Sequence, residues 1–163
     1  MVIVMGAITV YFTAAAVLVD VQERQGTAGA QAGIRVQERL VDDVLRNETS
    51  DALLAPGCAR SFFAQSGNRT CGFRDRGTGQ TYLRGVLGVS GGYDLNVTIA
   101  DEDGVLDTAH QAGESDYRHA IGPAVPPTES ATVYYRTVSF GTDDDGDGRI
   151  DYYTVTVRLW EVA

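Results

Sequence analysis

The sequence predicts an α+β protein in which a long hydrophobic N-terminal α-helix precedes an antiparallel, β-rich globular head. The first observation is that Met1–Val19 contains no charged side chain. The second is that apolar residues recur at three- and four-residue steps to about Leu45, whereas later segments alternate apolar and polar residues. We therefore expect a helical region at residues 1–46 and a head at residues 47–163.

The uncharged run Met1–Val19 is long enough to enter or cross the hydrocarbon of a bilayer. A helix that is apolar on every face must be buried in lipid or against other copies of itself. A secretory signal peptide is the alternative, but no Lys or Arg precedes the run and the helical pattern continues beyond Val19. We interpret the run as a membrane anchor that also packs between chains.

The helical pattern continues beyond this run. A single helix over residues 1–45 would be roughly 65–70 Å long, which exceeds what a small head covers. Four small residues within it are expected to let neighbouring helices approach closely: Gly26, Gly29, Ala30 and Gly33. Gly29 and Gly33 form a GxxxG motif. A flexible kink in the helix is the alternative interpretation.

Four segments of the head have the alternation and the Tyr, Val and Thr content of strands: Thr81–Val89, Tyr93–Ala100, Ala131–Phe140 and Ile150–Val162. Residues 90–92 predict a hairpin turn between the first two segments. The stretch Asp101–Glu129, with its prolines, predicts an irregular excursion. We expect an antiparallel sheet that packs one face on the amphipathic part of the helix.

The composition argues against nucleic acid as a partner. The formal net charge is −9, and all the basic side chains other than histidine are Arg, since the chain contains no Lys. A basic surface of the kind that binds phosphates is therefore not expected. The acidic, Asp-rich composition is similar to that of proteins from extreme halophiles, in which carboxylates keep the surface hydrated. High genomic GC content is the alternative source of the preference for Arg.

The chain has two cysteines, Cys58 and Cys71. A disulfide between them would stabilise the head by about 3 kcal/mol in an oxidising compartment. The alternative is two buried free thiols. Neither cysteine lies in a CxxC or Cys/His spacing, so redox and zinc chemistry are not expected.

All three asparagines of the chain lie in N-glycosylation sequons: Asn47-Glu48-Thr49, Asn68-Arg69-Thr70 and Asn96-Val97-Thr98. Glycan transfer takes place on exported chains and needs exposed acceptor residues. The three sequons therefore predict N-linked glycans at Asn47, Asn68 and Asn96 and an extracellular head.

The acidic stretch between the last two predicted strands resembles the calcium loop of EF-hand and dockerin-type sites. The ligands expected from this spacing are four carboxylates and one backbone carbonyl: Asp143, Asp145, Asp147 and Asp151, with the carbonyl of Arg149. The loop departs from that pattern at its twelfth position, where Thr154 replaces the bidentate Glu. The two interpretations are a structural Ca²⁺ site and a solvated acidic turn.

No catalytic motif is evident in the sequence. His110 and His119 do not lie in an HExxH pattern, and neither a GxSxG motif nor a glycine-rich phosphate loop is present. We interpret both histidines as surface residues. Neither an enzymatic activity nor a small-molecule substrate is expected.

The uncharged run, the helix that follows it and the β-rich head with sequons together resemble the mature form of an archaeal type IV pilin or archaellin. The resemblance implies a membrane-anchored subunit that becomes part of a homopolymer. Its N-terminal helices would form the core of an extracellular, cell-surface filament, and glycosylated heads would form the outer surface. Two departures are Met1 as the first residue and Met5, where bacterial-type pilins carry Glu. The alternative is a membrane-anchored cell-surface or viral spike glycoprotein that does not form filaments.

Overall fold

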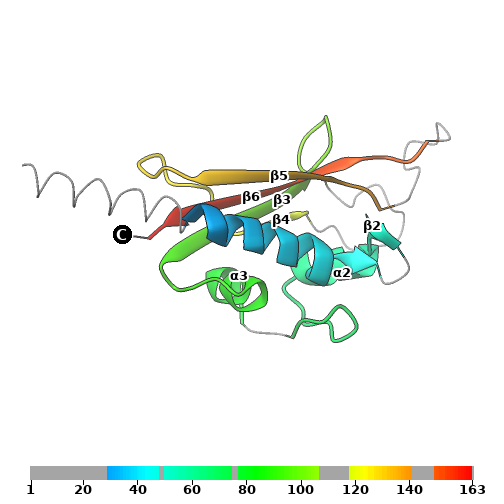
Figure 1. The fold of residues 1–163 in the computed structure, drawn as a ribbon, viewed down its shortest axis with the longest axis horizontal. Coiled ribbons are helices and arrows are strands. Elements are labelled where there is room, and N and C mark those ends of the chain that lie inside the picture. The colour runs from blue at the N-terminus through cyan, green and yellow to red at the C-terminus, as the bar shows by residue number, and fades with distance from the viewer. Residues whose placement is uncertain (1–28, 48–49, 75–76, 107–117, 141–148, 163) are drawn as a thin grey trace, which may run out of the picture. The chain divides into compact units, whose positions relative to one another are not determined.

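The computed structural model describes residues 29–47, 50–74, 77–106, 118–140 and 149–162 (Figure 1). Gly33–Ala163 forms one compact unit, and Met1–Ala32 is assigned to another. Residues 29–38 are α-helical and continue into the π-helical segment η1; together they are called the first helix. The named elements are η1 (Arg39–Val44), β1 (Arg46–Asn47), β2 (Ser50–Leu54), α2 (Pro56–Phe63), α3 (Gly79–Leu87), β3 (Tyr93–Ala100), β4 (Ala120–Ile121), β5 (Thr132–Val138) and β6 (Tyr153–Glu161).

The α+β class and the antiparallel sheet agree with expectation, but the prediction of a long hydrophobic N-terminal α-helix is wrong. Among the described residues the longest helix has 16 residues, and Met1–Val19 lies outside them. Across the described ranges, no helix is both long enough and apolar enough to span a bilayer. The first helix is amphipathic, which explains why it could not span a bilayer. Arg35 and Glu38 are exposed, and only one face, which includes Val36 and Leu40, is buried.

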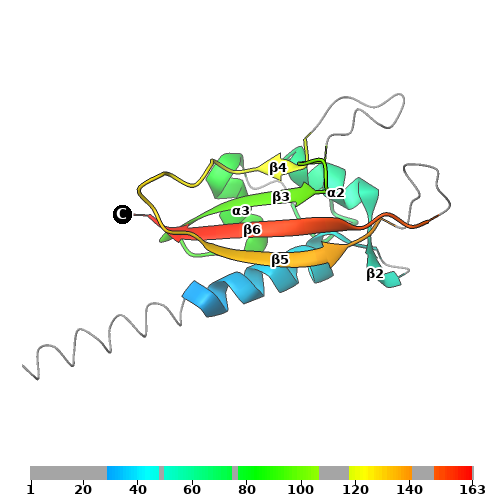
Figure 2. The same ribbon diagram turned by 90° about the horizontal axis from the view of Figure 1, so that it is seen from above.

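The sheet has four strands in the order β4-β3-β6-β5, and every pair is antiparallel (Figure 2). The helical residues of the compact unit lie on one side of it (Figure 1). One face of the two central strands supplies the main core: Leu95, Val97, Ile99, Val155, Val157 and Leu159. The first helix adds Val36, Leu40, Val41 and Val44 to the buried apolar residues. An ion pair of 2.8 Å between Arg136 of β5 and Asp42 also links sheet and helix.

The segment Thr81–Val89, expected to be a strand, is mostly the helix α3. Its buried side chains have helical spacing: Tyr82, Leu83, Val86 and Leu87. Gly88 follows in the left-handed conformation, with φ of 71°, which is a common way to end a helix. Tyr and Val content favoured a strand, but burial of one helical face against β3 decides the structure. Residues 90–92 consequently connect a helix to a strand and do not form a hairpin turn.

Four short elements were also unexpected: β1, β2, α2 and β4. Pro56, Gly57 and Cys58 form the first turn of α2, where Pro needs no hydrogen-bonding partner for its nitrogen. Within the stretch expected to be irregular, β4 pairs with β3 through Val97 opposite Ile121. A strand of two residues is too short to show an alternating pattern.

Candidate functional site

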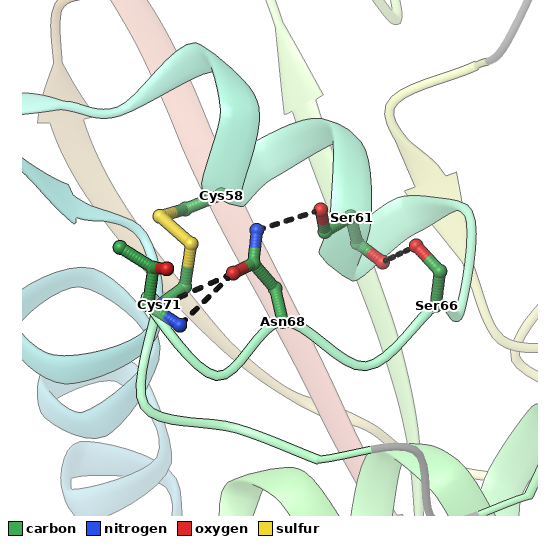
Figure 3. Close-up of a disulfide and its surroundings, with 6 residues drawn as sticks. Cys58, Ser61, Ser66, Asn68 and Cys71 are labelled. Atoms are coloured by element: carbon green, nitrogen blue, oxygen red, sulfur yellow. Dashed lines mark hydrogen bonds between the residues drawn. A yellow bond between two sulfur atoms is a disulfide. The ribbon is translucent and has the colours of Figure 1, made fainter.

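The disulfide Cys58–Cys71 lies beside the Asn68 sequon (Figure 3). Helix α2 supplies Cys58 and Ser61, and the loop that follows supplies Asn68 and Cys71. The Asn68 Nδ2 donates a hydrogen bond of 3.1 Å to Ser61 Oγ. Both cysteines are buried, each with 8% exposure, so the bridge is packed into the edge of the core. The disulfide ties the sequon loop to α2.

The Asn68 side chain also orders its own loop. Its Oδ1 accepts hydrogen bonds from the backbone N–H groups of Thr70, at 3.1 Å, and Cys71, at 3.3 Å. Such a bond to the backbone two residues ahead is an Asx-turn. Asn68 is half-buried, whereas Arg69 and Thr70 are exposed. The sequon therefore lies in a surface turn whose acceptor amide is held in one orientation.

The Asn96 sequon has a different environment, because Asn96 lies within the central strand β3 opposite Arg158. Its Nδ2 donates to the carbonyl oxygens of Gly122, at 3.2 Å, and Ile121, at 3.5 Å. Its Oδ1 accepts from Arg158 Nη1 at 3.2 Å. The third residue of this sequon, Thr98, is only 9% exposed. The carboxamide thus joins β3 to both neighbouring segments.

The third sequon is described only in part. Asn47 is the second residue of β1 and is paired with Ser50. Glu48 and Thr49 lie outside the described residues.

The expected calcium site is also described only in part. Asp143, Asp145 and Asp147 lie outside the described residues, whereas Arg149 and Asp151 are described and lie a few residues before β6. No group of three or more potential metal-ligating side chains occurs within the described ranges. Calcium binding by this loop stays a prediction.

The small residues expected to pack between helices have separate locations. Gly26 lies outside the described residues, and Gly29 and Ala30 are at the start of the first helix. Gly33 lies against the sheet of its own chain, where a Cβ would overlap the ring of Tyr134. One contact of this glycine is therefore intramolecular.

The interpretation of His119 as a surface residue is wrong, since it is 4% exposed. Its Nδ1 lies 3.2 Å from the carbonyl oxygen of Leu106, and its ring packs edge-on against Phe63. An imidazole can be buried when a ring nitrogen has a backbone partner and the faces meet aromatic rings. His110 lies outside the described residues.

Two tyrosines of the sheet have altered acidity. Burial raises the pKa of Tyr93, and Glu161 raises it further through its charge and a hydrogen bond of 3.4 Å from the phenol. Burial likewise raises the pKa of Tyr134. Both effects favour the neutral phenol.

Ser61 and Gly122, which hold the two described sequon asparagines in place, were not singled out from the sequence. Ser61 lies seven residues from Asn68 and Gly122 lies 26 residues from Asn96. No local spacing rule connects such pairs, because the fold brings them together.

A family model described as a family of unknown function, DUF7287, matches residues 1–160. Comparisons with curated proteins and with solved structures gave no match.

Proposed function

The chain belongs to the DUF7287 family of unknown function, and we propose that it is a structural subunit of an extracellular, archaeal type IV pilus-like filament. The compact unit Gly33–Ala163 would be the outer head of each subunit. The uncharged segment Met1–Val19 would be the part through which subunits assemble, after the membrane has held it.

The observation that carries this proposal is that the head has its own core. Among the described residues, every buried apolar side chain lies between Val36 and Trp160. The uncharged run Met1–Val19 precedes all of them. A contiguous apolar segment of this length is unfavourable in water and needs lipid or other copies to cover it.

The disulfide and the sequons support an extracellular location. The buried bridge Cys58–Cys71 is a kind of cross-link that persists in oxidising compartments. N-linked sequons acquire glycans on exported chains. Both features are expected of a head that faces the medium.

The experiment that tests this function is fractionation of the cells that make the protein. Filaments sheared from their surface should be visible by negative-stain microscopy, and mass spectrometry should identify this chain as their main component. A chain that remains in the membrane fraction, with no filament containing it, would favour the alternative of a membrane-anchored surface or spike glycoprotein.

A further inference from the structure

We infer that the sequons of Asn68 and Asn96 are not equivalent: Asn68 carries the glycan on the folded head, and the Asn96 carboxamide is a structural link. This inference deepens the proposed function, because it rests on export of the head to a compartment where glycans are transferred. It rests on the hydrogen bonds and the packing around each carboxamide.

At Asn68 the geometry leaves one amide hydrogen for reaction. The Nδ2 atom carries two hydrogens, and its hydrogen bond to Ser61 Oγ uses one of them. The carbonyl half of the carboxamide is held separately by the backbone N–H groups of Thr70 and Cys71 (Figure 3). Exposed residues surround the turn: Ser66, Gly67, Arg69 and Thr70. A glycan can therefore extend into solvent without breaking the Asx-turn.

The chemical step needs a glycosyl donor, which we take to be a lipid-phosphate-linked oligosaccharide. A bond forms between Asn68 Nδ2 and the anomeric carbon of the first sugar. The bond from that carbon to the donor phosphate oxygen breaks, and the phosphate leaves with the electron pair. The nitrogen loses one proton, which balances the charge gained by the phosphate. The N–H that remains can still donate to Ser61 Oγ.

At Asn96 the Nδ2 atom donates to two backbone carbonyl oxygens, those of Gly122 at 3.2 Å and Ile121 at 3.5 Å. The backbone there is also tightly packed. A Cβ on Gly122 would overlap the carbonyl oxygen of Leu95 and would lie 3.1 Å from the Asn96 Cα. A sugar on Nδ2 would displace this segment and would disturb its hydrogen bonds to Asn96, which is costly for partly buried polar groups.

The exposure of the threonine in each sequon supports the same distinction. A glycan-transfer enzyme must recognise the hydroxyl residue as well as the asparagine. Thr70 is exposed, whereas Thr98 is buried between strands. A chain modified at Asn96 before folding would lose the link to β4, so folded heads should lack that glycan.

The test is glycopeptide mass spectrometry of the full chain purified from the cells that make it. The peptide with Asn68 should carry added mass, and the peptide with Asn96 should be unmodified. Two matched variants keep both asparagines. Thr70→Ala should remove the added mass, because it removes the hydroxyl that the sequon requires. The Asx-turn should persist, because it uses only the backbone of residue 70. Thr98→Val should leave the intact mass unchanged apart from the substitution.

An unmodified Asn68, or a glycan on Asn96 in the folded protein, would overturn the inference. Shear fractionation keeps this result separate from the proposed function. Filaments whose subunits lack a glycan on Asn68 would contradict only the inference. A chain glycosylated on Asn68 but absent from filaments would contradict only the filament proposal.

Discussion

The ring of Tyr134 lies directly against the backbone of Gly33, so that hydrogen alone fits between the first helix and β5 at this point. The contact spans about a hundred residues of sequence and joins the helix to an edge strand of the sheet. Close approach of this kind makes the position sensitive to a single methyl group.

Gly33→Ala is expected to stabilise the head by less than the gain of about 1 kcal/mol that replacing Gly with Ala gives in a helix, because the added Cβ must displace the far end of the Tyr134 side chain. Urea unfolding measures the change. In a Tyr134→Val background the ring is gone, so Gly33→Ala should give the full gain. Equal effects in both backgrounds would show that the contact does not limit this position.

A second test concerns Gly122, which has φ of 95° and packs on the backbone of β3. Gly122→Ala should destabilise the head by more than about 1 kcal/mol, from both the left-handed conformation and the overlap with the Leu95 carbonyl. Gly57→Ala is the matched control, since no atom lies within 4 Å of its added Cβ. Thermal melting that responds equally to both substitutions would contradict the link between β4 and β3.

Tyr93 and Tyr134 predict loss of stability at alkaline pH. Their pKa values in the folded head lie above the ordinary value of 10.0. The contribution of these two phenols to the unfolding free energy is therefore fully present below pH 10 and is lost as the pH rises through the raised pKa values. Tyr93→Phe should make the decline in unfolding free energy shallower. Glu161→Gln should lower the pKa of Tyr93, measured by NMR of its ring. An unchanged titration would show that Glu161 does not act on this phenol.

Calcium is expected to bind the acidic loop that precedes β6. Chelation at constant ionic strength should lower the melting temperature of the head, because closely spaced carboxylates repel one another without a cation. Asp147→Ala should lower it in the same way. If neither treatment changes melting while lower total salt destabilises the head, the aspartates serve as a solvated acidic surface.

Some elements could be predicted from local sequence and others could not. Tyr93–Ala100 was placed correctly, because alternating residues follow Gly91 and Gly92 and face a core on one side. Thr81–Val89 was wrong because its composition favours strands, while its partner surface selects a helix. The surroundings of Asn68 and Asn96 could not be predicted for a similar reason. Both lie in Asn-x-Thr motifs, but one carboxamide contacts Ser61 and the other contacts Gly122, and only the fold supplies these contacts.

In the proposed filament, the uncharged N-terminal segment assembles subunits while the head folds independently. Ala15→Asp places a carboxylate within Met1–Val19. A buried unpaired charge is strongly unfavourable, so this variant should abolish filaments in sheared fractions while the head keeps its melting temperature. Ala64→Asp, at an exposed position after α2, is the control and should leave filaments intact. Filaments of normal abundance from Ala15→Asp cells would contradict assembly through this segment.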